Sequence, residues 1–384
     1  MIGYAKSALL FAAALGCAAT ADACTSWVIH RSCTKDGRMI LQKCRDSRVA
    51  KLSADIRIAP DGRRWMRIGI GEHWPTFAMN EKGLVATMND GDDLTVKHPG
   101  GEKLGIGTGD ILRKVMLECD NAYDAAVIIR DYGRNMRRNG RGGTLLVADP
   151  KRAFLIDVTP GYGEMKEITG GMVIISNCLH LPGIEDISRQ KVGALRGDRS
   201  REANVRKELK AARVDGKYTV RGTIRVSRMR CGKNMKDKYP FRKNSQGCVC
   251  FEIDGEFPAQ LSTAYIALGP QQHTVYLPCP MALERLPQQF GSGEWGDLAL
   301  NFRKKAGDDH KLVGELFALE DKIITEYEQA REEARSLLRA GKRSEAEKLL
   351  NDLFAKHFAA AEKLLNELYG KVEANPNSYN DSCF

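Results

Sequence analysis

The sequence has no apolar run of the roughly 18–20 residues that a membrane-spanning helix needs. It also lacks a Gly-x-Gly-x-x-Gly segment between a strand and a helix, and it lacks a phosphate-binding loop ending in Gly-Lys-Ser or Gly-Lys-Thr, so nucleotide chemistry is disfavoured. No cysteine–histidine spacing is typical of zinc, and Cys248 and Cys250 are too close together for the usual ligand pair. The sequence therefore predicts no membrane span, no cofactor and no metal.

The composition is that of a folded chain with one large domain. The chain has 384 residues, of which 43% are hydrophobic and 28% are charged. This balance argues against disorder. The length allows one domain with a sizeable core and a smaller appendage.

The first 23 residues have the three parts of a secretory signal. Lys6 precedes a short apolar stretch at 8–15, and Ala21-Asp22-Ala23 has the small residues that signal peptidase recognises. We therefore expect a signal peptide over 1–23 and a mature chain that begins at Cys24. The protein is expected to be exported, to the periplasm or to the cell exterior.

Export would place the cysteines in an oxidising compartment, where disulfides form. Of eleven cysteines, Cys17 is lost with the signal. Cys33 and Cys44 flank a turn signal, so we expect them to be bridged or nearly touching across a hairpin. A second bridge is available among Cys231, Cys248 and Cys250, although the sequence does not determine the connectivity.

The formal net charge of +10 is concentrated between Arg189 and Lys243, where nineteen Lys or Arg face five Asp or Glu. Two interpretations are open: a site for an anionic partner, or a solvated surface of helix and loops. Few aromatic residues interleave with these charges, which disfavours binding of single-stranded nucleic acid. No specific nucleic-acid partner is expected.

The pattern along the chain changes from strands to helices and back to strands. Two helices are predicted over 108–119 and from Asn121 to before Gly133. Strands are predicted on both sides of this pair, over 25–33, 39–43, 56–58, 64–70, 77–89 (with a central turn), 143–149, 153–158, 172–176, 261–268 and 274–277. This order favours a layered α+β domain and not a doubly wound parallel sheet.

The last quarter of the chain is predicted to be a helical hairpin. Residues 310–339 and 344–372 are long, charged segments with apolar residues at helical spacing, and Gly341 separates them. Two helices bury too little surface alone, so we expect the hairpin to dock on the main domain or to form a homo-oligomer. The expected organisation is a signal peptide at 1–23, an enzyme domain at 24–305, the hairpin at 306–373 and an irregular tail at 374–384.

Cys24 would carry unusual chemistry as the first residue of the mature chain. An α-amine has a pKa of about 8 and a thiol one of about 8.5. The amine can therefore act as general base for the thiol of the same residue, which makes Cys24 a candidate N-terminal nucleophile. Such a site also needs donors for the oxyanion and charged groups that orient the amine.

Polar residues at the ends of predicted strands can supply these groups. Lys43, Arg45 and Asp46 end the strand that follows Cys24 in the first hairpin. Asn89 and Asn177 end two further strands. Turn residues of purely structural importance are the alternative for each of them.

Four segments resemble, in order, one group of enzymes. The segments are "ACTSWVI" with "DGRMILQKCRDS", then "MNEKGLVATMND", "GGTLLVADPKRAFLIDVTP" and "MVIISN", which together span Cys24 to Asn177. They resemble the cysteine branch of the N-terminal-nucleophile hydrolases. That branch includes choloylglycine hydrolase and penicillin V acylase, the isopenicillin N acyltransferase and carcinine hydrolase family, and related secreted dipeptidases.

The resemblance implies an αββα sandwich and hydrolysis of a linear amide bond in a small amide or peptide. It implies that Cys24 is the nucleophile and that Asp46 binds the nucleophile and its amine. Asn177 matches the oxyanion asparagine, Asn89 the second asparagine, and Arg228 a late arginine that supports the nucleophile.

Lys43 stands where choloylglycine hydrolases usually have arginine, and Cys178 follows Asn177 where the acyltransferase group often has histidine. These departures concern the subfamily more than the reaction class.

Three alternatives remain open from the sequence. The first is an acyltransferase of the same fold. The second is a secreted, disulfide-containing protein that binds an anionic partner and has a non-catalytic Cys24. The third keeps the enzyme but makes His180 the base. His30 cannot serve, because six residues of strand at about 3.3 Å each would separate it from Cys24 by some 20 Å.

Overall fold

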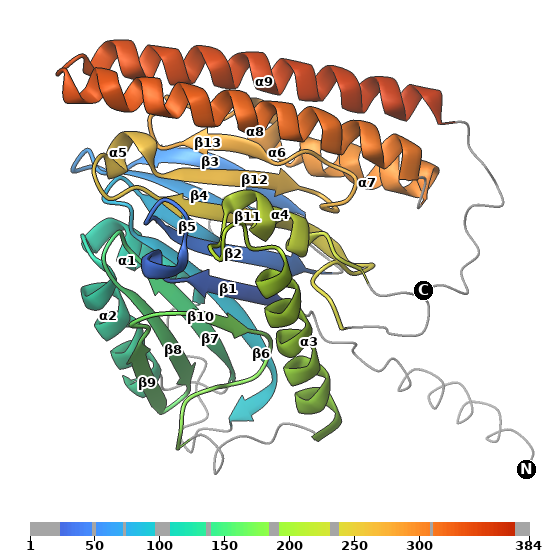
Figure 1. The fold of residues 1–384 in the computed structure, drawn as a ribbon. Coiled ribbons are helices and arrows are strands. Elements are labelled where there is room, and N and C mark those ends of the chain that lie inside the picture. Colours follow the sequence, from blue (N-terminus) through green and yellow to red (C-terminus); the bar gives the residue numbers. More distant parts are fainter. Residues whose placement is uncertain are drawn as a thin grey trace, which may run out of the picture.

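The protein has two antiparallel sheets that pack face to face between layers of helices, as Figure 1 shows. This computed structural model describes residues 24–47, 51–71, 74–96, 108–135, 140–183, 192–230, 238–307 and 310–372. The predicted signal peptide, Cys17, Cys231 and the predicted tail lie outside the described residues.

The first sheet has six strands and contains the start of the described chain. Its strand order is β10-β1-β2-β11-β12-β13. The strands are β10 (Met172–Ile175), β1 (Thr25–Ile29), β2 (Met39–Asp46), β11 (Ser245–Ile253), β12 (Thr263–Leu268) and β13 (Leu277–Pro280).

The second sheet has seven strands in the order of the sequence. They are β3 (Leu52–Ile58), β4 (Arg64–Ile70), β5 (Trp74–Asn80), β6 (Val85–Val96), β7 (Gly140–Ala148), β8 (Ala153–Thr159) and β9 (Tyr162–Glu167). The predicted turn inside 77–89 joins β5 to β6. It requires Gly83, whose φ of +75° lies in the left-handed region that glycine adopts readily.

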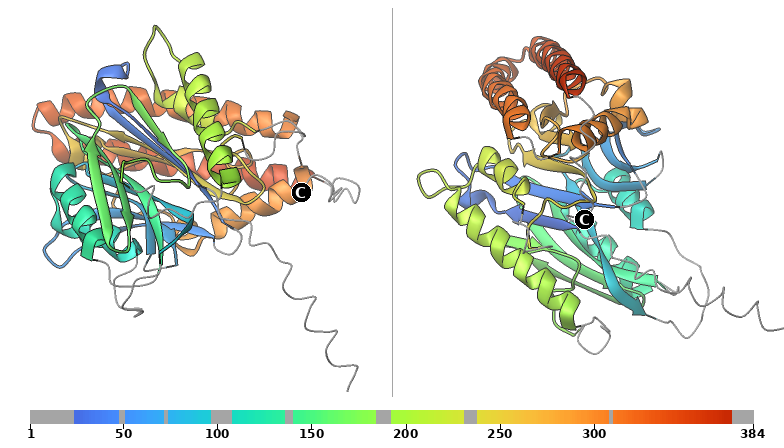
Figure 2. Two further views of the ribbon diagram at one scale, coloured as in Figure 1. Left: turned by 90° about the horizontal axis from the view of Figure 1, so that it is seen from below. Right: turned by 90° about the vertical axis from the view of Figure 1, so that its right-hand side faces the viewer.

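Helices cover the outer faces of both sheets, which gives the αββα order that the resemblance implied (Figure 2). The apolar faces of α1 and α2 pack on the second sheet, and those of α3, α4 and α8 pack on the first. The helices are α1 (Thr108–Glu118), α2 (Ala122–Asn135), α3 (Val192–Ala211), α4 (Val220–Ser227), α5 (Pro258–Leu261), α6 (Gln288–Ser292), α7 (Glu294–Ala306), α8 (His310–Arg339) and α9 (Arg343–Lys371). None of the helices in the described ranges is long and apolar enough to cross a membrane.

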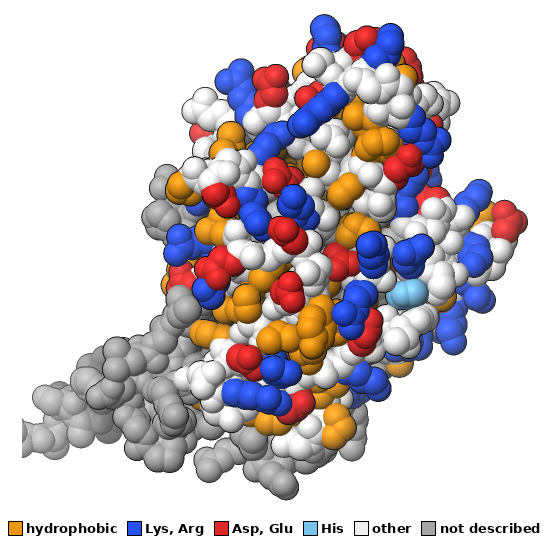
Figure 3. All heavy atoms as spheres, turned by 90° about the vertical axis from the view of Figure 1, so that its left-hand side faces the viewer, with side chains coloured by type: hydrophobic (Ala, Val, Ile, Leu, Met, Phe, Trp, Pro, Cys, Tyr) orange, Lys and Arg blue, Asp and Glu red, His pale blue; other side chains and the backbone are white. Residues whose placement is uncertain are grey.

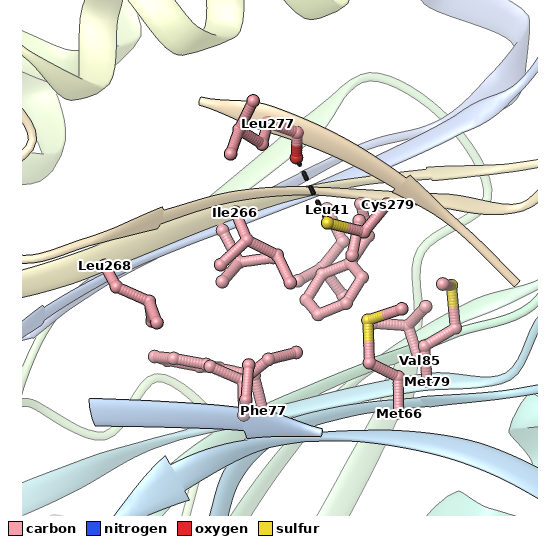
Figure 4. Packing of buried hydrophobic residues seen from close by; sticks show 14 of the residues in the cluster. Leu41, Met66, Phe77, Met79, Val85, Ile266, Leu268, Leu277 and Cys279 are labelled. Atoms are coloured by element: carbon pink, nitrogen blue, oxygen red, sulfur yellow. Dashed lines mark hydrogen bonds between the residues drawn. The ribbon is translucent and has the colours of Figure 1, made fainter. Parts of the chain in front are cut away.

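The main hydrophobic core fills the space between the sheets, as Figure 4 shows. Leu41 and Ile266 of the first sheet face Phe77 and Met66 of the second, and all four side chains are fully buried. Alternate residues of each strand point into this core, so the other residues of β1 and β2 face the helices.

The C-terminal hairpin of α8 and α9 docks on the main domain beside β13 (Figure 1). Buried ion pairs reinforce this contact. Glu252 of β11 pairs with Arg331 of α8 and, at 2.9 Å, with Arg38. Asp254 pairs with Arg335 of α8 at 2.5 Å. Although burial opposes ionisation, Arg331 and Arg38 hold the pKa of Glu252 at about 2.

The expected bridge between Cys33 and Cys44 is wrong. Both cysteines are free. Cys44 pairs with Thr25 at the start of β1, whereas Cys33 lies in a short 3₁₀ helix beyond the end of that strand. The thiol that lies next to Cys44 belongs to Cys248, its direct partner on β11.

Candidate active site

Cys24 directly precedes β1, and its position is fixed by the neighbouring strand β10. Its backbone nitrogen donates a hydrogen bond of 2.6 Å to Oδ1 of Asn177, which follows β10. Nδ2 of Asn177 donates to the carbonyl oxygen of Asp90 in β6 at 2.6 Å. Asn177 therefore connects Cys24 to both sheets. Its amide oxygen contacts the backbone nitrogen of Cys24, which would become an amine if the signal peptide were removed.

Lys43 brings a buried positive charge to the thiol of Cys24. Its side chain is fully buried, and Nζ donates to the carbonyl oxygen of Met88 at 2.8 Å and to Oδ1 of Asn89. Burial lowers the pKa of Lys43, while the adjacent Cys24 thiol raises it by electrostatic attraction and a hydrogen bond. Lys43 thereby places a buried ammonium group against the sulfur of Cys24.

Asn89 lies at the site, and both ends of its amide group already have hydrogen-bond partners. Its Oδ1 accepts from Lys43 and, at 2.7 Å, from Ser26. Its Nδ2 donates to the carbonyl oxygens of Ile175 and Ser176 at 3.2 and 3.1 Å. In this arrangement Asn89 positions Lys43 and the end of β10. Its role as an oxyanion donor stays a prediction.

Asp46 ends β2, two residues beyond the register partner of Thr25, and is fully buried. Oδ1 accepts a hydrogen bond of 2.6 Å from Ser245, and Oδ2 lies 4.0 Å from a guanidinium nitrogen of Arg242. Burial raises the pKa of Asp46 to about 6, against the attraction of Arg242 and other nearby cations. Asp46 is thus a buried carboxylate near the start of β1 whose hydrogen bond goes to Ser245, and its predicted contact with Cys24 and the amine stays a prediction.

Arg201 of α3 is a site residue that the sequence did not single out. Nη1 donates a hydrogen bond of 3.0 Å to the carbonyl oxygen of Cys24, and Nη2 pairs with Asp198 at 2.7 Å. Its charge also acts on Asp46. It is one of nineteen basic residues in the segment from Arg189 to Lys243, and nothing in the local pattern distinguishes it from the others.

Arg228 does not lie at this site, which corrects the prediction made for it. Its guanidinium pairs with both carboxylate oxygens of Glu320 on α8 at 2.8 and 2.6 Å and stacks on the ring of Phe317. Glu320 also accepts from the backbone nitrogen of Tyr276, next to β13. Four strand spacings of about 4.8 Å separate β13 from β1. Arg228 anchors α4 to the hairpin.

His180 is engaged on the helix side of the first sheet. Its Nε2 lies 2.9 Å from Oε1 of Glu202 on α3 and 3.8 Å from Sγ of Cys178. Asn177 contacts the nitrogen of Cys24, whereas the next residue, Cys178, contacts Glu202 on α3. Nε2 of His180 is therefore directed to Glu202 on α3 and not to Cys24.

The basic segment forms a hollow at the other end of β1. The hollow has a volume of about 430 Å³, and its lining includes Arg206, Lys210, Arg213 and Lys217. Figure 3 shows this end of the molecule, where Lys and Arg side chains gather near a histidine. Because β1 lies between this hollow and Cys24, the two are separate sites.

Comparison with known proteins found similar solved structures. No family model and no curated protein matches the chain. Two variants of conjugated bile acid hydrolase from Clostridium perfringens share 12% identity with it. One covers 64% of this chain and 89% of its own with a TM-score of 0.43, and the other covers 67% and 92% with a TM-score of 0.44. Penicillin V acylase from Agrobacterium tumefaciens shares 13% identity, covers 64% of this chain and 84% of its own, and has a TM-score of 0.41.

The raised pKa of Asp46 has a consequence for stability that can be measured. The folded chain binds the Asp46 proton more tightly than the unfolded chain, whose pKa is near 3.8. This stabilising contribution is complete below pH 4 and is lost as the pH rises through 6. Above that range the ionised, buried carboxylate costs up to about 3 kcal/mol relative to a neutral group.

We therefore expect Asp46→Asn to be more stable than the wild type at pH 8, with the difference shrinking toward pH 4. Urea unfolding of both proteins at the two pH values measures this. If the free energy of unfolding of Asp46→Asn is lower than that of the wild type by the same amount at both pH values, the expectation is contradicted.

Proposed function

We propose that the protein is an amide hydrolase in which Cys24 is an N-terminal nucleophile. The observation that carries this proposal is the pair of contacts made by Cys24 itself. Its nitrogen is held by Asn177 at 2.6 Å, while its thiol lies against the buried ammonium of Lys43. The mechanism needs a base and a nucleophile. Asn177 holds the nitrogen that would be the base, and Lys43 contacts the thiol that would be the nucleophile.

The proposed reaction begins once cleavage after Ala23 has converted the nitrogen of Cys24 to a free amine. The amine accepts the thiol proton, and the thiolate attacks the carbonyl carbon of a linear amide. The resulting ammonium donates its proton to the leaving amine, and a thioester remains on Cys24. Water then hydrolyses the thioester and restores the thiol.

The surrounding residues have separable positioning roles. Asn177 holds the amine through its amide oxygen, and Lys43 stabilises the thiolate. Arg201 fixes the backbone of Cys24 through its carbonyl oxygen. Asp46 supplies a negative charge near the start of β1, and this charge favours the protonated amine. Donation to the oxyanion by Asn177 or Asn89 stays a prediction.

Hydrolysis is preferred over acyl transfer on chemical grounds. The proposed export places the enzyme where coenzyme A thioesters are scarce and water is abundant. The substrate class is therefore a small linear amide or peptide.

Trapping the thioester tests the proposal. The mature protein is mixed with penicillin V, with a glycine-conjugated bile acid and with simple dipeptides as probe amides, then quenched in acid and digested. We expect one probe to add the mass of its acyl group to the peptide that contains Cys24, and hydroxylamine to remove it. The variant Cys119→Ala, which lacks a buried thiol packed with α1 and α2, should give the same adduct. An adduct on another residue, or no adduct and no hydrolysis with any probe, would contradict the proposal.

A further inference from the structure

Three side chains of types that commonly ligate metals come together next to the residues that hold Cys24. Cys178 and His180 lie in the segment after β10, and Glu202 lies one turn along α3 from Asp198. Their Sγ, Nε2 and Oε1 atoms all lie within 4.8 Å of one another. The separations are 3.8 Å from sulfur to nitrogen, 3.4 Å from sulfur to oxygen, and 2.9 Å from nitrogen to oxygen.

This arrangement differs from that of a catalytic Cys-His-Glu triad. In a triad the imidazole contacts the thiol through one ring nitrogen and the carboxylate through the other. Here Cys178 and Glu202 both face Nε2 of His180, and Nδ1 has no hydrogen-bond partner in the described chain. The three atoms surround one point instead of forming a relay.

The dimensions of this triangle fit a small divalent cation. A circle through its three corners has a radius of about 2 Å, so an ion on or just above the plane is within bonding range of all three atoms. Zinc binds histidine nitrogen and carboxylate oxygen at about 2.0–2.2 Å and cysteine sulfur at about 2.3 Å. Mixed thiolate, imidazole and carboxylate ligands suit zinc better than magnesium or calcium, which prefer oxygen.

Neighbouring groups hold the three ligands in position. The backbone nitrogen and hydroxyl of Ser176 donate to Oε1 of Glu202 at 3.1 and 2.6 Å, and Arg199 pairs with the other oxygen at 3.1 Å. Asp157 accepts the backbone nitrogen of His180 at 2.5 Å. Such outer contacts are typical of metal sites, where they fix the orientation of the ligands.

The geometry points to a zinc site formed by Cys178, His180 and Glu202, with a fourth position for water. The sequence did not predict it because Glu202 is 22 residues from His180 and belongs to a different element. The inference does not depend on the proposed amidase chemistry.

The position of the site suggests a structural effect on Cys24. Asn177, which holds the nitrogen of Cys24, directly precedes one ligand, and Arg201, which holds its carbonyl oxygen, directly precedes another. An ion bound by Cys178, His180 and Glu202 would tie the segment after β10 to α3. It would thereby fix both polar partners of Cys24.

Metal analysis of the full chain, purified without a metal-affinity tag, tests the inference. We expect the protein equilibrated with zinc chloride and then gel-filtered to retain about one zinc per chain. His180→Gln and Cys178→Ser should retain less than a tenth of that. Cys279→Ser, which removes a buried thiol between the sheets, is the matched control and should bind like the wild type.

Cobalt substitution gives a second measurement that does not require the ligand variants to fold. Replacing zinc by cobalt chloride in the wild-type protein should produce a thiolate-to-cobalt charge-transfer band in the near ultraviolet. Wild-type protein that retains no stoichiometric zinc and gives no such band would overturn the inference. So would folded ligand variants that bind zinc as the control does.

Discussion

Cys24→Ala is expected to abolish amide hydrolysis while leaving the chain folded. The substitution removes the only atom proposed to form the thioester, and losses on the order of 10⁴-fold or more are usual when a covalent nucleophile is deleted. Buried thiols elsewhere in the described chain are poorly suited to replace it. Burial raises the pKa of the Cys250 and Cys279 thiols, which disfavours their nucleophilic thiolate forms.

The measurement compares turnover by Cys24→Ala, Cys279→Ala and the wild type, using whichever probe amide is hydrolysed. Circular dichroism and urea unfolding show whether each variant is folded. Cys279→Ala should retain turnover within a few-fold, at some cost in stability from the cavity that it leaves. Turnover by folded Cys24→Ala within tenfold of the wild type would show that the nucleophile lies elsewhere.

A single glycine retained ahead of Cys24 is expected to lower turnover by about 100- to 10,000-fold, the range of general acid–base catalysis. The extra residue converts the amine into a peptide nitrogen, which has no basicity. The contact with Asn177 does not require a free amine, because a peptide nitrogen at Cys24 donates that hydrogen bond. The extended chain therefore lacks the basic amine, while Cys24 keeps its position.

The matched pair is produced by cleaving a removable fusion so that one chain starts at Cys24 and the other at the added glycine, with intact mass confirming each start. Iodoacetamide added after denaturation should label Cys24 in both proteins, which shows that the thiol is still present in each. If the extended protein hydrolyses its amide at the full rate, the base is another group, and His180 is the first to replace.

The parts of this molecule that were predictable from sequence depend on contacts between residues close in the chain. The strands β1, β2, β5, β6, β7, β8 and β10 were predicted from β-branched, apolar segments bounded by turn residues. Lys43 and Asn177 were found because each ends such a strand, and the structure brings both to Cys24.

The parts that were missed depend on long-range packing. The strand β11, with the sequence SQGCVCFEI, was not predicted, although it lies between β2 and β12 in the middle of the first sheet. Arg201 reaches Cys24 across 177 residues of sequence. The bridge between Cys33 and Cys44 was expected from the turn between them, but register, which the turn alone did not fix, places Cys44 opposite Thr25.

The ion pairs under the C-terminal hairpin make it inseparable from the rest of the fold. Removing α8 and α9 would take away Arg331 and Arg335 and leave Glu252 and Asp254 as buried charges with fewer partners. Loss of one partner from a buried pair typically costs about 3–5 kcal/mol, a large part of the stability of an ordinary domain. A shorter chain with this sandwich would therefore need changes at Glu252 and Asp254 to offset the loss of the helices.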